Sequence, residues 1–198
     1  QAVLDGATNV AFSSTAGGGT LVAADPTTAR GPIKSQMVAD SKTLLRRRNA
    51  MPYFGQMHAC VIHPDVLRDL QAESGTNTWR QPHEQVDTSN IYNGEAGSYM
   101  GVTFIENTNC TIVPHATNPD LYTTYFVGKQ ALFEAVGQDI SVVVADPIDA
   151  LKRFYRVGWY ALLGVSRFRE NAIQLLKTSS SLNTGFFGGT LPTVDGKA

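Results

Sequence analysis

Three residues come closest to a metal-binding motif in this sequence: His58, Cys60 and His63, spaced as HxCxxH. Imidazole and thiolate are ligands that zinc prefers, and a structural zinc site takes four of them. The segment is a short apolar run typical of a strand, so His58 and Cys60 point to one face and His63 to the other. This geometry opposes joint ligation of one ion. We therefore predict a core cysteine and a histidine at the strand end, and no metal site.

A hydrolase or ligand-binding site is the second chemical hypothesis. It would be assembled from His63, His83, Glu84 and His115, with Asp87 in the same polar loop as His83. None of these residues has a nucleophile beside it in a recognisable motif. The sequence also lacks GxSxG, HExxH, a phosphate-binding loop and the dinucleotide fingerprint GxGxxG. We therefore predict no catalytic residue, no cofactor and no enzyme activity.

The remaining reactive groups have ordinary structural interpretations. Cys60 and Cys110 are too few to form a disulfide framework, so we expect two buried thiols. The basic triplet at residues 46–48 could contact phosphate. However, three charges are a small footprint in a chain of net charge −1, so we interpret them as a solvated helix end or an interface contact. Only 17% of the residues are charged, which leaves neutral surface for burial against other subunits.

The chain of 198 residues is long enough to bury a core, and 42% of its residues are hydrophobic. No apolar run reaches the roughly 18 residues that a membrane-spanning helix needs, so we expect no membrane partner. The first residues carry no signal-peptide pattern. Because the first residue is Gln1, we expect a processed chain or part of a longer protein.

The elements that must position these residues follow from periodicity. Apolar residues at helical spacing predict a helix over residues 28–48, with Pro32 in its first turn and three arginines at its end. Pro64 opens a second helix over residues 65–73. Residues 129–136 are predicted to form a short third helix.

The other segments are predicted to be strands and loops. Residues 1–27 hold a short element followed by a loop, and residues 75–90 form a polar surface loop with a lone Trp79. Aromatic and β-branched enrichment predicts strands at residues 57–62, 102–106, 122–127, 141–145, 153–168 and 172–177. Trp159 is expected to be buried in the core. The Asn93-Gly94 step predicts a turn, and Gly94 and Gly101 are expected to be backbone positions rather than ligand contacts. Helices and strands without a βαβ rhythm predict an α+β fold.

Three segments, in this order, resemble the major capsid proteins of tailed bacteriophages. They are MHACVIHPDVLRDL at residues 57–70, IYNGEAGSYMGVTFIENTN at residues 91–109, and GWYALLGVSRFRENAI at residues 158–173. The middle segment is similar to the family pattern Asn-Gly-Glu, Gly, then Gly-Val-x-Phe-x-Glu-x-x-Asn. Order and spacing agree over about residues 39–180. The N-terminal arm, the E-loop hairpin and the spine helix of that family have no counterpart here.

The resemblance implies a Hong Kong 97-type capsid fold with peripheral and axial domains. Residues 1–56 and 150–180 would form the peripheral domain, residues 57–149 the axial domain, and residues 181–198 an extended tail. Phe186 and Phe187 in this tail would lie on the subunit surface or across a subunit boundary. Loop charges at Arg80, Glu84 and Asp87 would meet around the capsomer axis.

The function that the resemblance implies is structural. The chain would self-assemble into pentamers and hexamers of an icosahedral shell, within a virion built in the bacterial host cytoplasm. Scaffolding, portal and decoration proteins are further expected partners, and encapsidated double-stranded DNA would be bound weakly and without sequence specificity. A nanocompartment shell of the same fold, with enzyme as its cargo, is the alternative.

Overall fold

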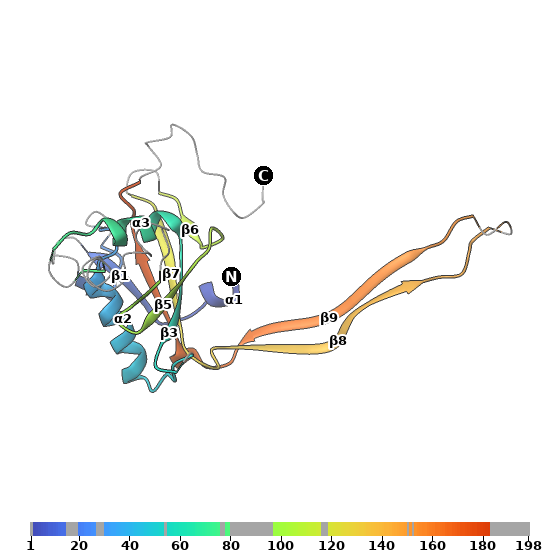
Figure 1. Ribbon diagram of the computed structural model, residues 1–198, viewed down its shortest axis with the longest axis horizontal. Helices are drawn as coiled ribbons and strands as arrows, with labels where there is room; N and C mark the ends of the chain where they lie inside the picture. The colour runs from blue at the N-terminus through green and yellow to red at the C-terminus, as the bar shows by residue number, and fades with distance from the viewer. Residues whose placement is uncertain are drawn as a thin grey trace. The chain divides into compact units, whose positions relative to one another are not determined.

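A computed structural model describes residues 2–14, 20–26, 30–53, 55–75, 78–79, 97–115, 119–149, 151 and 153–182 of the chain. The described residues divide into two compact units, which Figure 1 shows with the strand and helix labels used below. Unit 1 contains residues 1–131 and 169–198, and unit 2 contains residues 132–168. The two units are described separately.

Unit 1 is built on one mixed sheet. Along the sheet the described strands run in the order β2, β1, β10, β7, β3, β5 and β4, with β6 paired to β7. Their bounds are β1 Val10–Ser14, β2 Thr20–Val22, β3 His58–Ile62, β4 Ser98–Tyr99, β5 Val102–Glu106, β6 Ile112–Val113, β7 Leu121–Val127 and β10 Ile173–Thr178. Strands β1 and β10 are parallel, as are β3 and β5, whereas β7 runs antiparallel to both β3 and β10.

Helices α2 (Ser35–Arg47) and α3 (Pro64–Ala72) cover one face of this sheet. Gln174 of β10 is the register partner of Phe126 in β7, so both side chains point to this face, as does Tyr122 four residues earlier. Arg48, at the end of α2, donates to Gln174 Oε1 at 2.7 Å, and Tyr122 donates to Asp65 of α3 at 3.0 Å. Buried residues on this face and on the two helices form one part of the core of unit 1. Tyr125, Ile173 and Leu175 lie on the opposite face of the sheet and are buried as well.

Helix α2 has a clear apolar stripe because Met37, Val38 and Leu45 recur at helical spacing and are buried. Its end is set by Asn49, whose φ of 56° is a left-handed conformation that asparagine tolerates better than most residues. The sequence predicts a helix from residue 28, and this start is wrong, because α2 begins at Ser35. Pro32 instead forms an isolated bridge with Ser179.

Helix α3 begins as the sequence predicts, with Pro64 in its first turn. The ring of His63 caps this helix, because its Nδ1 accepts a hydrogen bond from the Asp65 backbone N–H at 3.2 Å. Val66, Leu67 and Leu70 face the core. The strand–His-Pro–helix segment is therefore a local unit that the sequence determines well.

The other face of the sheet meets the short helix α1 (Ala2–Asp5). Asp5 accepts hydrogen bonds from Tyr125 and from Thr111, the latter at 2.7 Å. A single 3-10 turn, η1 (Glu170–Ala172), leads into β10. No helix among the described residues is both long and apolar enough to cross a membrane.

Two predictions for unit 1 are wrong. Residues 10–14 and 20–22, expected within a loop, form β1 and β2 at the sheet edge. Trp79, expected on a surface loop, is only 2% exposed, and its backbone N–H donates to Ser35 Oγ at the start of α2. Both errors have a related cause: β1 is held by β10, and Trp79 is held by Ser35, both distant in sequence, so local polarity misrepresents their environment.

Unit 2 is a two-stranded antiparallel hairpin of β8 (Leu132–Val144) and β9 (Val157–Arg167). The helix predicted over residues 129–136 is wrong, because Leu132 to Val136 pair with β9. The strand predicted at residues 141–145 is only the outer part of β8. Two register shifts, between Val136 and Gln138 and between Gln138 and Ser141, interrupt the pairing.

The compact units do not follow the predicted domain boundaries. Strands β1 and β10, assigned to the peripheral domain, share a sheet with β3, β5 and β7, assigned to the axial domain. Peripheral and axial are positions around a capsomer axis, so the assignment of 1–56, 150–180 and 57–149 to them stays a prediction. The tail prediction lies mostly outside the described residues, which end at residue 182.

Candidate functional site: an uncovered apolar hairpin

The HxCxxH residues are separated by the fold. His58 and Cys60 are fully buried on the helix-covered face of β3, whereas His63 is the cap of α3. Burial raises the pKa of the Cys60 thiol well above its usual value. Burial has the opposite effect on His58 and lowers its pKa. The hydrogen bond to the Ala50 carbonyl raises this pKa, whereas the nearby charges of Arg46 and Lys42 lower it further. These groups belong to the core.

His63 is part of a small polar cluster instead of a catalytic set. Its ring packs against that of Tyr122 with centroids 5.1 Å apart, and its Nδ1 lies 3.5 Å from Asp65 Oδ2. Burial lowers the pKa of His63, while the charges of Asp65 and Glu106 oppose that shift. The Tyr122 pKa is raised by burial and then by Asp65. A tyrosine and a histidine fixed in this way serve to join α3 to β7.

The other members of the hypothetical hydrolase site are not brought to His63. The backbone N–H of His115 donates to Asp120 at 2.9 Å, in the turn before β7. His83, Glu84, Asp87 and Arg80 lie outside the described residues, as does Gly94. Within the described ranges, no group of three or more His, Cys, Asp or Glu residues is arranged to hold a metal ion.

Cys60 and Cys110 are both buried free thiols, which confirms their predicted state. Burial raises the pKa of Cys110 to about 11, and the charge of Asp5 contributes to the same shift. A thiol held protonated in this way is a poor nucleophile at neutral pH. Gly101 has a φ of 76°, and a side chain there would meet Lys42 Nζ at 2.6 Å. Its role is therefore to allow the turn between β4 and β5.

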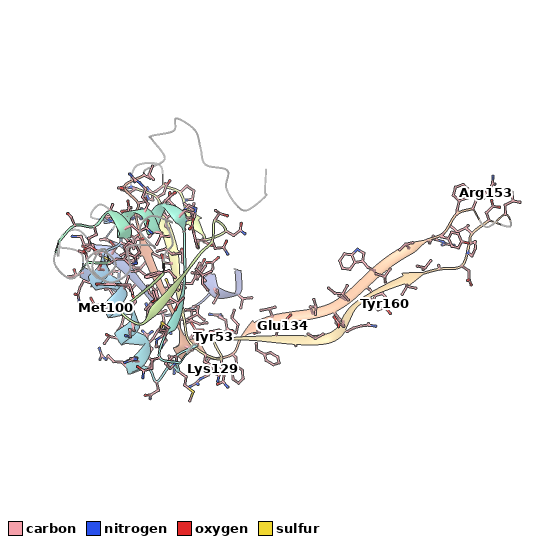
Figure 2. The ribbon with its side chains drawn as sticks, viewed as in Figure 1. Tyr53, Met100, Lys129, Glu134, Arg153 and Tyr160 are labelled. Atoms are coloured by element: carbon pink, nitrogen blue, oxygen red, sulfur yellow. The ribbon has the colours of Figure 1, made fainter. Side chains whose placement is uncertain are left out.

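The exposed apolar side chains of the described residues concentrate in unit 2. Trp159, expected in the core, is 74% exposed, which corrects that prediction. Most of the exposed large apolar residues of the hairpin lie on its two strands: Leu132, Phe133, Val136, Ile140, Val142, Val143, Val144, Val157, Trp159, Tyr160, Leu162, Leu163 and Val165. Figure 2 shows the side chains along the hairpin, with Glu134, Tyr160 and Arg153 labelled.

The register assigns these side chains to two faces. Residues that oppose each other across an antiparallel pair share a face, and the face alternates along each strand. Val142 pairs with Trp159, Val144 with Val157, and Val136 with Leu163. We call the face that contains these six residues and Val165 the Trp159 face. Its members are about half exposed or more.

The opposite face, which we call the Tyr160 face, contains two glycines and the exposed Phe133 and Val143. Along β9, Tyr160 and Leu162 lie there between Gly158 and Gly164, and Ser141 opposes Tyr160. A methyl group at Gly158 or Gly164 would meet no atom within 4 Å. The glycines are therefore not required by contacts within the chain. They leave room for another chain segment to approach the backbone closely.

An isolated two-stranded hairpin is marginally stable in water, and this one carries apolar side chains on both faces. Contiguous exposed apolar surface on a soluble protein marks an interaction site. We therefore identify unit 2 as the candidate functional site and its chemistry as burial against another polypeptide. Arg153 and Asp149 form an ion pair at 2.8 Å near its turn, but the strands themselves carry few charges.

One sequence signal could have found this site. Residues 141–145 and 153–168 are rich in valine, leucine and aromatic residues, and both are predicted from sequence to be strands. The sequence does not say that these strands lack a covering layer, because apolar strands usually lie in a core. Burial was inferred from composition, and composition does not distinguish a core strand from an interface strand.

The chain was compared with known protein families and with solved structures, and both comparisons lead to phage capsid proteins. A sequence model described as phage capsid protein matches residues 2–177. No curated protein matches the chain by sequence.

Solved structures resemble the chain at low sequence identity. The capsid asymmetric unit of cyanophage Pam1 has a TM-score of 0.58 at 16% identity, covering 77% of this chain and 50% of that one. The capsid of Helicobacter pylori bacteriophage KHP30 has a TM-score of 0.58 at 14% identity, covering 75% and 60%. The capsid of Ralstonia phage GP4 has a TM-score of 0.55 at 13% identity, covering 80% and 51%. The chain thus spans half to three fifths of the length of these capsid chains.

Proposed function

Because this chain belongs to the phage capsid protein family, we propose that it is a structural subunit of a tailed-phage head, which works by burying its surfaces against other subunits. The fold is the predicted α+β fold of the Hong Kong 97 type, shared with the capsid chains of Pam1 and KHP30. The family is one of structural proteins, which supports the prediction that the chain is not an enzyme.

The observation that carries the proposal is the hairpin of unit 2. Its Trp159 face exposes seven large apolar side chains, including Trp159, Val142 and Leu163. An apolar face of this kind is stable only when another surface covers it. A shell subunit is surrounded by neighbours on all sides, and heterologous contacts between identical subunits close into rings. Pentamers and hexamers of a closed shell are the assemblies we propose.

Further partners and the location belong to the same proposal. The assembled chain is a component of the virion, built in the cytoplasm of the bacterial host. Portal, scaffolding and decoration proteins would contact the shell, and the shell would enclose double-stranded DNA. A nanocompartment shell of the same fold would enclose enzyme instead, so the enclosed cargo distinguishes the two.

The test compares two charge insertions in the full-length protein. Trp159→Glu combined with Leu163→Glu places charge on the Trp159 face, and Ile105→Glu places it at an exposed apolar position of unit 1. We expect particles by electron microscopy from the wild type and from Ile105→Glu, and none from the hairpin variant. Because these side chains are exposed in the single chain, all three proteins should unfold at similar temperatures. Particles of normal number and size from the hairpin variant would refute the role of this face.

A further inference from the structure

The end of helix α2 gathers positive charge from two parts of the sequence. Arg46 and Arg47 lie in its last turn, and Lys42 lies one turn earlier. Lys129, which follows β7, lies at the same end of unit 1, because its backbone N–H donates at 2.8 Å to the carbonyl of Met51, four residues beyond the end of α2. We call these four residues the α2-end cation cluster. Figure 2 labels Lys129, and Figure 1 shows α2.

The cluster has no acidic partner among the described residues. The ion pairs of the described part of unit 1 join Asp25 to Arg30, Asp65 to His63, and Asp69 to Arg68. Arg46, Arg47 and Lys129 are exposed and take part in none of them. Lys42 donates to the Met100 backbone carbonyl, which leaves its charge uncompensated.

The helix itself accounts for only part of this charge. A helix C-terminus carries the equivalent of about half a negative charge, whereas the cluster has four cations. Lys42 and Arg46 are spaced i, i+4, where like charges are unfavourable. Burial and the Arg46 charge together lower the pKa of Lys42, which reflects this crowding. An arrangement that repels itself within the chain is relieved by an external anion.

We propose that the α2-end cation cluster binds phosphate groups of the double-stranded nucleic acid that the shell encloses. The proposal rests on the proposed function for the presence of that nucleic acid. Arginine and lysine together are the usual phosphate contacts, and such contacts need no base sequence. To Arg46 and Arg47, which are visible in the sequence, the structure adds Lys42 and Lys129, and none of the four is in an ion pair with a described carboxylate.

An acidic surface of a second copy is the competing partner, and the described residues offer a poor one. The carboxylates outside ion pairs include Glu106 in unit 1 and Glu134, Asp139 and Asp146 in the hairpin. Glu134 and Asp139 are five residues apart on an extended strand, which separates them by about 17 Å. Phosphates of duplex DNA supply one negative charge per about 1.7 Å of axis, which suits a compact cluster far better.

The experiment measures binding of the full chain to a labelled duplex of about 30 base pairs by fluorescence anisotropy, at several salt concentrations. The test variant combines Arg46→Gln, Arg47→Gln and Lys129→Gln. The control variant combines Lys34→Gln, Arg68→Gln and Lys177→Gln, all in unit 1. It has the same net charge, but each of its cations already has a partner within the chain, which is Asp69 for Arg68 and the Phe12 ring for Lys177.

We expect the test variant to bind on the order of 100-fold more weakly at about 0.15 M salt, with a salt-dependence slope shallower by about 2.7. The control variant should stay within about threefold of the wild type and keep the wild-type slope. Equal losses in the two variants would overturn the proposal, since they would report net charge alone. Unchanged DNA binding with altered self-association in a sedimentation experiment would overturn it in favour of a second copy. Failure of the proposed function would appear separately, as the absence of particles from the wild-type protein.

Discussion

The two tryptophans of the described chain have opposite environments, so they test the assignment of core and interface residue by residue. Trp79 is buried in unit 1, and Trp159 is exposed on the hairpin. We expect Trp79→Ala to lower the free energy of unfolding by about 3–5 kcal/mol, as large core truncations do. Trp159→Ala should change it by less than about 0.5 kcal/mol in the unassembled chain. Urea denaturation of both variants measures this difference, and a large loss in Trp159→Ala would place that residue in a core after all.

His58 gives a pH dependence with a defined sign. The pKa of His58 is lowered in the folded chain, first by burial. Below the ordinary histidine pKa of about 6.5, the unfolded chain therefore binds a proton at this residue that the folded chain does not bind. Stability should therefore be full above about pH 6.5 and fall as the pH drops, by at most about 1.4 kcal/mol per pH unit for one group. His63 contributes in the same direction.

The measurement is the free energy of unfolding between about pH 7.5 and 5 for the wild type and His58→Gln. The variant should show a shallower loss on acidification, because one of the two histidines no longer titrates. His63→Gln is the matched single-histidine control. A pH profile of His58→Gln that coincides with the wild-type profile would rule out the contribution of His58.

At the scale of elements, the end of α2 depends on one backbone conformation. Asn49 has a φ of 56°, and its backbone N–H donates to Arg46 O at 3.0 Å. Asn49→Ala should lower stability by about 1 kcal/mol, because alanine tolerates the left-handed region poorly. Asn49→Gly should be neutral or slightly stabilising at the same position. Thermal unfolding of the two variants gives the comparison, and equal effects would show that the conformation is not the determinant.

Elements with local determinants were the ones that the sequence predicted well. The His63–Pro64 start of α3 and the β-branched strands β5 and β7 agree with prediction within a residue. The strands β1 and β2 were missed because β1 is held by β10, from the other end of the sequence. The prediction of a helix over residues 129–136 is wrong because the spacing of apolar residues in so short a segment does not distinguish a helix from a strand. Pairing with β9 makes residues 132–136 a strand.

The strands of the candidate site could be predicted from sequence, but their exposure could not. The strands at residues 141–145 and 153–168 were recognised, and the family resemblance indicated self-assembly. Their exposure could not be read from composition, since an interface strand and a core strand use the same residue types. The cation cluster at α2 shows the same limit. Arg46 and Arg47 are visible in the sequence as part of a basic triplet, whereas the position of Lys129 depends on a backbone hydrogen bond to Met51.

At the scale of the whole molecule, we expect proteases to cleave the hairpin in the unassembled chain but not in assembled particles. The end of the hairpin contains exposed Arg153 and Arg156. We expect trypsin to cut the unassembled chain first at these arginines, before Arg46 and Arg47 within helix α2. In assembled particles the same bonds should be protected. Mass spectrometry of early fragments identifies the sites, and equal cleavage in particles and free chains would contradict the burial of unit 2.

The connection between the two ends of the chain in unit 1 has a consequence for the order of synthesis. The Asn9 side chain donates to the Ile173 carbonyl across 164 residues, and β1 pairs with β10 beside it. On a ribosome that adds about 5–20 residues per second, β1 waits roughly 10–30 s for its partner strand. The apolar hairpin, which lies between β7 and β10 in the sequence, emerges during that interval. Each nascent chain therefore exposes its apolar hairpin before β10 completes the sheet of unit 1, so we expect molecular chaperones to bind this protein during translation.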